Sequence, residues 1–519
     1  MAQTVTLVEV DVTSPAGVTS TLRFSDRAIR PLPPSEPIYS NVPWDDRLID
    51  PPTLRRSLFD DMATLTPALG VGSMSLSNGD GGLDAYRGHL WRTIRIWRWT
   101  EGQPFSTASR LLSGLATPPE YDDSTSSSAS VSVSLYDYSV ELDRDIQPTV
   151  YSGGNGTGGV LYEGAADGLK GRPKPLGFGR LTDAHIPAPQ VNAAVLAYQL
   201  HDAAISGGVQ IFDRGSPAGY AAQPDRAGSV FDAYTPPAAG SVTDLGRGLL
   251  KINGDPVGKL TFGFQGESAG GYVETVGPIL ARILARAGVP ADRIGASIGA
   301  LSAPAPVGLW VGDTTSAAAI VAKLARSAGA AVLPDRQGVW QAFKFAAPAA
   351  SPAFEIGADQ VVRLSADNAG VAPAGVVRIG WGQVYTTFTT SELLPALVKT
   401  TTAERLATEY RYAVAEDATV KSRLPTTWRT IEIDTALRLE ADAQALANDL
   451  RALFGLRADG APRRQWKVVL EMTPEALAMS LGATVRLVYP PRGIDGLYLL
   501  VGEEPMRPSR DLMTWTLWG

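Results

Sequence analysis

The strongest candidate for chemistry in this chain is the serine of Gly266-Glu-Ser-Ala-Gly270, which fits the G-x-S-x-G pattern of a nucleophile elbow. In that arrangement a strand precedes the serine, a helix follows it, and an acid and then a histidine come later in the chain. Residues 259–264 predict the strand, but every histidine precedes Ser268: His89, His185 and His201. A serine hydroxyl without a general base is a weak nucleophile near neutral pH, so we expect no enzyme. A serine hydrolase or esterase that uses Ser268 in another residue order stays an alternative.

Two further patterns bear on cofactors and metals. Gly154-Asn-Gly-Thr-Gly-Gly159 has the spacing of a dinucleotide-binding loop, which needs a strand before it and a helix after it. Residues 160–162 predict extended chain instead, so we interpret the segment as a linker. The histidines have no metal-ligand spacing and the chain has no cysteine. The sequence therefore predicts no catalytic, cofactor-binding or metal-binding residue, and no cofactor.

Charged residues raise two other possibilities. A local basic cluster is suited to phosphate or DNA contact, but only one aromatic side chain is interleaved with it, so ion pairs at an interface are favoured; its members are Lys170, Arg172, Lys174 and Arg180. Paired carboxylates invite a cell-wall lytic activity, which stays an alternative, although neighbouring carboxylates in a sequence are usually solvated. These pairs are Asp45-Asp46, Asp60-Asp61 and Glu503-Glu504.

Composition limits the class of protein. At 519 residues the chain is too long for one hydrophobic core, and 44% hydrophobic with 19% charged residues is typical of a folded protein. A net charge of −7 argues against a protein that grips nucleic acid. Met1-Ala-Gln-Thr4 is neither basic nor apolar, and no apolar run of about 18 residues occurs, so neither a signal peptide nor a membrane span is expected.

Hydrophobic periodicity divides the chain into four predicted domains: β-rich 1–155, β-rich 156–265, a small α/β insert 266–345 and an α+β region 346–519. Helices are predicted at 278–288, 316–328 and 435–454, and a hairpin turns at 335–338. Strands are predicted at 89–99, with Trp91, Trp97 and Trp99 on one side, and at 129–137, with Val131, Val133 and Leu135 inward. Later predicted strands are 375–381, 384–389, 465–471, 483–489 and 512–518.

One segment carries a family resemblance: Glu163-Gly-Ala-Ala-Asp-Gly-Leu-Lys-Gly-Arg-Pro-Lys-Pro-Leu-Gly-Phe-Gly-Arg180. Its prolines favour extended backbone, and its glycines allow tight turns or close neighbours. It resembles the "EG…DLKG+PKP…+G" segment of tail-hub (baseplate hub) proteins of tailed bacteriophages and related prophage tails. Other stretches match that family in order: 5–12, 21–24, 54–59, 77–84, 198–202, 211–215, 308–313 and 440–445.

The resemblance implies a structural virion protein at the distal tail tip or baseplate, assembled in the host bacterial cytoplasm. Tail-tube-like β-barrels from 1–155 and from part of 346–519 would form a ring, typically a homotrimer. The implied partners are the distal tail protein, the tape measure protein and tail fibre or central spike proteins. The ring would gate DNA ejection, with DNA passing through unbound. A receptor-binding fibre is a further alternative, although no repeat is present.

Overall fold

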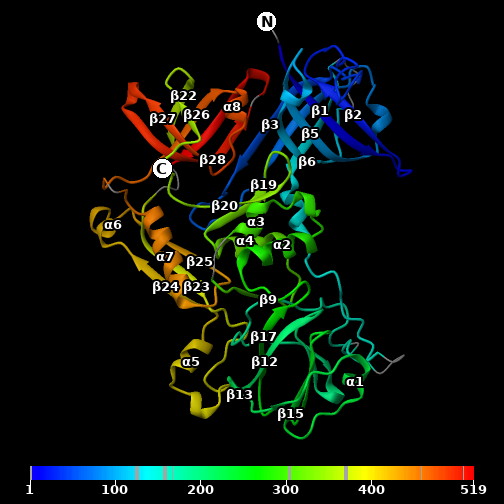
Figure 1. Cartoon of the computed structure of the whole chain (residues 1–519), viewed down its shortest axis with the longest axis vertical. Helices are drawn as coiled ribbons and strands as arrows, with labels where there is room; N and C mark the ends of the chain where they lie inside the picture. Colours follow the sequence, from blue (N-terminus) through cyan, green and yellow to red (C-terminus); the bar gives the residue numbers. More distant parts are fainter. Residues whose placement is uncertain are drawn as a thin grey trace.

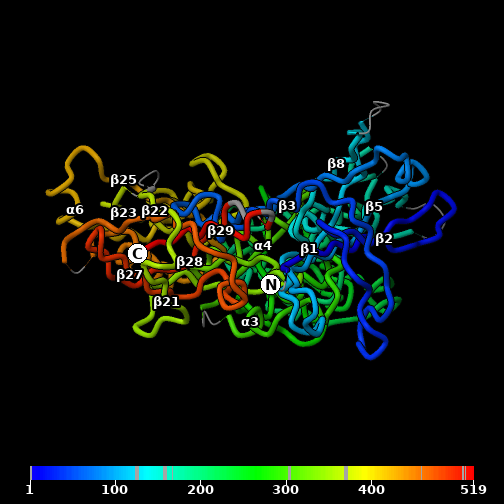
Figure 2. Tube along the Cα trace, turned by 90° about the horizontal axis from the view of Figure 1, so that it is seen from above, coloured from blue at the N-terminus to red at the C-terminus, as the bar shows by residue number. Residues whose placement is uncertain are grey.

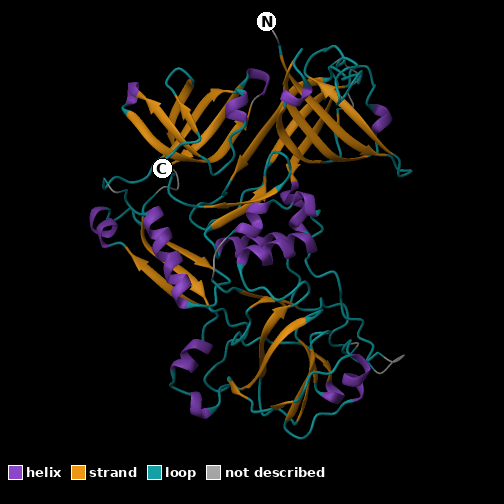
Figure 3. Ribbon diagram, viewed as in Figure 1, coloured by secondary structure: helices purple, strands orange, loops and turns teal. Residues whose placement is uncertain are grey.

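The computed structural model describes residues 3–122, 128–155, 160–165, 167–301, 305–367, 372–457, 459–506 and 508–519. Two strand-rich units lie side by side at the top of the view, several helices lie below them, and another strand-rich unit lies at the bottom (Figures 1 and 3). The β-rich α+β fold that the sequence predicts is confirmed. Among the described helices, none is long and apolar enough to cross a membrane.

One of the N-terminal strands alternates apolar and polar residues, as a strand with one buried face requires. In β8 (Ser130–Asp137), Val131, Val133 and Leu135 are buried, as predicted, and the serines between them are more exposed. The other strands here are β1 (Thr4–Thr13), β2 (Thr19–Ser25), β3 (Leu48–Ser57), β4 (Val71–Ser77), β5 (Leu90–Thr100), β6 (Ser109–Ala116) and β7 (Glu120–Tyr121). Their main pairing order is β2-β1-β5-β6-β8-β4-β3, and β7 pairs with β8.

Strand β5 departs from simple alternation at its start. Trp97 packs in one hydrophobic cluster, whereas Trp91 packs with Ile94 in another. The register with β1 shifts between Val10 and Val12, where two residues of β5 lie opposite one residue of β1. Such a bulge inverts the alternation of side chains. The prediction that Trp91 shares a face with Trp97 is therefore wrong.

The two upper units share one 14-stranded sheet. The predicted closing strands are confirmed as β26 (Gln465–Glu471), β27 (Thr484–Tyr489) and β29 (Leu512–Trp518), but the longest strand, β28 (Ile494–Met506), was not predicted. The first half of β28 pairs with β27, and its second half pairs with β3 of the N-terminal unit. The N-terminal and C-terminal strands accordingly lie side by side when seen from above (Figure 2).

The pairing of the described strands leaves this sheet open. Its order runs from β2 at one edge to β22 (Val361–Asp367) at the other, while β21 (Phe354–Ile356) pairs only with β27. An isolated bridge between Phe24 and Asp45 links β2 to the segment that leads into β3. The predicted tube-like barrels are therefore not confirmed, because no strand pair closes either unit.

The insert between these ends has the predicted helices. Helix α2 (Val276–Arg286) buries Ile279 and Ile283, and α4 (Ala317–Arg326) begins after Ser316, whose hydroxyl accepts from the Ala319 N–H. The predicted hairpin is formed by β19 (Ala330–Pro334) and β20 (Trp340–Lys344). The remaining elements are α3 (Ala296–Ala300) and β18 (Gly308–Val311), which pairs with β9 (Leu176–Gly179).

The lowest unit in Figure 1 contains two small sheets, with strand orders β10-β11-β16-β15-β14 and β13-β12-β17. Its elements are β10 (Gln190–Asn192), β11 (Ala197–Gln199), β12 (Ile205–Asp213), β13 (Ser216–Pro217), β14 (Ala221–Ala222), α1 (Gly228–Ala233), β15 (Gly240–Asp244), β16 (Leu249–Asn253) and β17 (Leu260–Glu267). A separate hydrophobic cluster, which includes Ile186, Phe262 and Phe264, lies within this unit. The short strands agree with the many turn residues of this part of the sequence.

A three-stranded sheet with α7 (Glu440–Phe454) packed on it forms the remaining part. It comprises β23 (Ala374–Trp381), β24 (Arg411–Glu416) and β25 (Arg429–Asp434), with α5 (Thr401–Leu406), α6 (Ala418–Arg423) and, further on, α8 (Pro474–Leu477). Residues 384–389 form no strand, and residues 435–439 are not helical, so both predictions are wrong. The cause is tertiary: Thr435 Oγ1 donates to the Gly380 carbonyl at 2.6 Å, and this contact holds 435 in extended chain.

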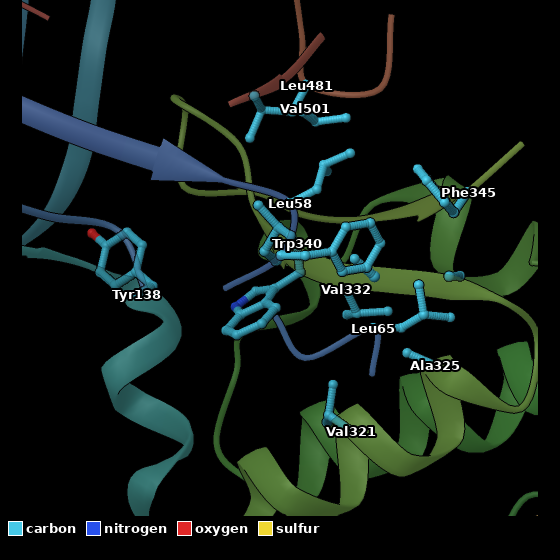
Figure 4. Packing of buried hydrophobic residues seen from close by; sticks show 14 of the residues in the cluster. Leu58, Leu65, Tyr138, Val321, Ala325, Val332, Trp340, Phe345, Leu481 and Val501 are labelled. Atoms are coloured by element: carbon cyan, nitrogen blue, oxygen red, sulfur yellow. The ribbon is translucent and has the colours of Figure 1, made fainter. Parts of the chain in front are cut away.

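Side chains from distant parts of the sequence meet around the hairpin. Trp340 is 1% exposed and packs with residues of the N-terminal unit, α4 and the C-terminal unit (Figure 4). The labelled neighbours include Leu58, Leu65, Val321 and Val501. Five tryptophans of the two upper units are also buried within the chain itself: Trp91, Trp97, Trp99, Trp515 and Trp518.

Candidate functional site

Ser268 lies directly after β17, in a turn that precedes α2. Its backbone N–H donates to the Ala204 carbonyl at 2.9 Å, and its carbonyl accepts from the Gly271 N–H at 2.9 Å. Among the described residues, no hydrogen bond joins the Ser268 hydroxyl to a histidine or a carboxylate. The helix does not leave directly from the serine, because α2 begins only at Val276.

The other residues of the motif serve packing. A Cβ on Gly266 would lie 2.7 Å from the Gly177 carbonyl oxygen of β9, so glycine is required where the two strands cross. Glu267 is buried, and its carboxylate forms ion pairs with Arg286 and, at 3.7 Å, with Arg282 of α2. Strand crossing and helix anchoring thus explain a sequence that otherwise suggests an esterase.

The two buried histidines are engaged elsewhere. His201 Nδ1 accepts from the Gly177 N–H at 2.8 Å, and His185 Nδ1 lies 3.0 Å from Thr261 Oγ1. Burial, aided by nearby arginines, lowers the pKa of each to about 3, so both are neutral near pH 7. The described residues contain no group of three or more histidine or acidic side chains arranged to hold a metal ion.

Because of these two histidines, the free energy of unfolding depends on pH in the acidic range. An unfolded histidine binds a proton below about pH 6.5, whereas His185 and His201 stay neutral in the fold down to about pH 3. Each therefore lowers the free energy of unfolding by up to about 1.4 kcal/mol per pH unit as the pH falls through this window. In His201→Asn, which keeps an acceptor for the Gly177 N–H, we expect the pH slope in urea unfolding between pH 6 and 4 to decrease by about one proton. An unchanged slope would contradict the neutral form of His201.

We expect the Ser268→Ala substitution to leave both the stability of the chain and its rate of ester cleavage unchanged. The hydroxyl makes no described contact that the fold needs, so the change in unfolding free energy should stay within about 0.5 kcal/mol. Release of 4-nitrophenol from its acetate ester should be equal for the variant and the parent chain. An ester-cleaving activity that disappears in Ser268→Ala, with the unfolding midpoint preserved, would instead establish the hydrolase alternative.

The basic cluster is divided by the structure. Lys174 Nζ lies 2.6 Å from Glu163 Oε1, so this charge is neutralised within the chain, while Lys170 and Arg172 are exposed. In the glycine-rich segment, residues 156–159 lie outside the described part, and 160–165 contain no helix. The continuation that a dinucleotide-binding loop needs is therefore missing from the described residues that follow.

The structure brings two of the carboxylate pairs to one small pocket. Asp60, Asp61 and Glu504 line a pocket of about 210 Å³. Glu504 lies 2.6 Å from Arg55 Nε, so the basic side chain already holds its carboxylate. A pocket of this volume is smaller than an ordinary substrate site, so it gives the lytic alternative no support.

A buried ionic junction is the feature that sequence reasoning missed. Glu503, on β28, is 1% exposed and accepts from Arg336 in the β19–β20 turn; Arg56 on β3 lies 3.9 Å away. Arg336 also donates to the Leu477 carbonyl, and Arg56 donates to the Pro334 carbonyl at 2.8 Å. Burial lowers the pKa of Arg336, and the Glu503 charge opposes this effect. No local signal predicts these contacts, because Arg56 and Pro334 are 278 positions apart.

The open strand edges are the candidate interface. Strand β22 pairs along one side with β26, and Val362 on it is 57% exposed. At the opposite end of the same sheet, Thr19 and Ser20 of β2 are exposed, while Ser25 is covered through its N–H bond to the Asp45 carbonyl at 2.7 Å. Unpaired edges carry free backbone donors and acceptors that suit pairing with another chain.

No protein-family model matches the chain, and no curated protein matches its sequence. One similar solved structure is a tail protein from Neisseria meningitidis MC58, with 10% identity and a TM-score of 0.40 over 98% of this chain and 96% of that chain. A second is the prophage MuSo2 43 kDa tail protein from Shewanella oneidensis, with 9% identity and a TM-score of 0.40 over 90% of this chain and 94% of that chain. A third is the prophage tail protein gp18 from Listeria monocytogenes EGD-e, with 8% identity and a TM-score of 0.37 over 98% of this chain and 94% of that chain. All three of these structures are named as tail proteins, two of them of prophages.

Proposed function

We propose that this chain is a structural protein of a phage tail and forms the baseplate hub at the distal tip. The ordered set of hub-like segments, centred on residues 163–180, is the observation that carries this proposal. The buried ionic junction and the shared sheet support it, because they tie the two ends of the chain into one rigid platform. No catalytic step is assigned to any residue.

The proposed assembly is a homotrimeric ring. In it, the unpaired edges β2 and β22 pair with strands of neighbouring copies, residues 1–155 and part of 346–519 line the ring, and the insert 266–345 lies outside it. The ring joins the tail tube and distal tail protein to the tape measure and to a central fibre or spike. DNA passes through without specific binding, as the net charge of −7 allows, and opening of the ring gates ejection.

Electron microscopy of purified tails decorated with an antibody against this chain tests the proposal. Label confined to the distal tip is expected, with undecorated tails and pre-immune serum as controls. Label along the tube, or absence of the chain from tails, would overturn it.

The edge-pairing part has a separate test. A lysine at Val362 places a charge on the open edge of β22 and should reduce the ring-sized species in analytical ultracentrifugation at least tenfold. Val257→Lys is the matched control, because Val257 is 75% exposed but lies in a turn. If both variants assemble like the parent chain, β22 does not take part in the ring.

A further inference from the structure

A polar cleft lies in the lower strand-rich unit, beside α1. Its volume is about 400 Å³, which is within the range of small-molecule sites. Five separate segments line it: residues 160–163, Lys174, the end of β11 with residues 202–203, Asp232 of α1, and the turn that leads into β16. Such convergence of distant segments on one hollow is a feature of binding sites rather than of a single loop.

Both signs of charge face this cleft in paired form. Lys174 Nζ lies 2.6 Å from Glu163 Oε1 and 4.0 Å from Asp202 Oδ1. Arg247 Nη2 lies 2.6 Å from Asp232 Oδ1. The lining has three carboxylates, those of Glu163, Asp202 and Asp232, and two basic side chains, so its net charge is −1 and it disfavours an anionic ligand. Carboxylate oxygens and N–H groups of these residues can serve a neutral polar ligand.

One buried polar group lacks a partner. Gln199 lines the cleft and is 6% exposed, and its Oε1 makes no hydrogen bond among the described residues, although its Nε2 donates to the His201 carbonyl at 3.4 Å. An unsatisfied buried acceptor costs about 1–3 kcal/mol, so a ligand donor at this position would recover that energy.

Apolar surface completes the cleft. Leu161 is 40% exposed and Tyr162 is half-buried, and both line it beside the charged pairs. Burial raises the pKa of Tyr162, as do the charge of the Asp232 carboxylate and the hydrogen bond between the two side chains, so the Tyr162 hydroxyl oxygen remains to accept from a ligand. Hydrogen-bond donors, hydrogen-bond acceptors and apolar surface are therefore all present in the lining of the cleft.

From this combination we propose that the cleft binds a sugar, one to two rings in size. Sugar hydroxyls both donate and accept, which matches acceptor-only carboxylates interspersed with donor-only Lys and Arg, and the C–H face of the ring suits Leu161 and Tyr162. Gln199 Oε1 accepts from one hydroxyl. The proposal is independent of a position at the tail tip and stands if that position is wrong.

Saturation-transfer difference NMR on the full chain tests this proposal, with glucose, galactose and N-acetylglucosamine as probes at millimolar concentration. We expect transfer to at least one sugar, weakened tenfold or more in Gln199→Leu and in Asp232→Asn. Asp225→Asn is the control, since Asp225 binds Thr243 and Leu245 of the same unit outside the cleft and should leave binding unchanged.

Two further results would overturn the proposal: no transfer to any of the three sugars, or equal transfer in the parent chain and both cleft variants. Inorganic phosphate, followed by ³¹P line width, is the competing probe. Phosphate binding that displaces the sugars and is lost in Lys174→Gln would identify an anion site instead. Asp232→Asn lies at the rim, so it tests the proposal even if Gln199→Leu fails to fold.

Discussion

Replacement of Glu503 by alanine is expected to lower the free energy of unfolding by about 3–5 kcal/mol. The substitution leaves Arg336 and Arg56 buried without their anion, and both arginine side chains are under 10% exposed. An uncompensated buried charge is far more costly than the pair itself is stabilising. Urea unfolding followed by tryptophan fluorescence measures the loss.

The neighbouring residue supplies a matched control. Glu504 points to the other side of β28, where it pairs with Arg55 at 2.6 Å and with Lys467 at 3.8 Å on a more exposed surface. Glu504→Ala should therefore cost less than about 1 kcal/mol. Equal losses in both variants would show that burial of the junction is energetically unimportant. The double variant Glu503→Met/Arg336→Met should be more stable than Glu503→Ala, since it removes two of the three buried charges.

Truncation of Trp340 to alanine is expected to cost about 3–5 kcal/mol, because the indole fills the space where three parts of the chain meet (Figure 4). Leu58 and Leu65, which follow β3, and Val321 of α4 belong to the same cluster and are held by their own elements, so a cavity remains. Thermal and urea unfolding should both show the loss, and the transition should also become broader if the parts lose their cooperativity.

Trp340→Phe distinguishes lost volume from lost hydrogen bonding. The indole Nε1 of Trp340 is buried and has no hydrogen-bond partner among the described residues. Phenylalanine keeps most of the apolar volume and removes that unsatisfied donor, so the expected cost is below about 1.5 kcal/mol. A loss as large as that of the alanine variant would contradict a packing role.

Local patterns predicted those elements whose stability depends on near neighbours in sequence. The helices around 278–288 and 316–328, the hairpin at 335–338 and the alternation of β8 all follow from spacing of a few residues. The predictions for residues 384–389 and 435–439 were wrong because long-range contacts determine the backbone conformation there. The Val384 N–H, for example, donates to the Glu409 carbonyl at 2.9 Å. Strand β28 was missed since Gly496 and Gly502 interrupt its pattern.

Among the candidate sites, too, features that depend on local sequence could be predicted and those that depend on long-range contacts could not. The order of the histidines along the chain predicted that none of them serves Ser268, and in the structure His201 and His185 contact Gly177 and Thr261. The Glu503 junction and the sugar cleft were not predictable, since their members come from segments that only the fold brings together. Glu163 and Lys174 both lie in the segment 163–180 that carries the family resemblance. Asp232 and Arg247, which complete the cleft, have no local sequence pattern that indicates a site.

The pairing of β3 with β28 has a consequence for biosynthesis. Ser57 Oγ donates to the Val501 carbonyl across 444 positions, so the partner of β3 is synthesised long after β3 itself. Until then the nascent N-terminal sheet carries an unpaired edge, which is a template for aggregation during translation. The central sheet can be completed only after β28 has been synthesised, so its folding depends on a segment made 444 positions after β3.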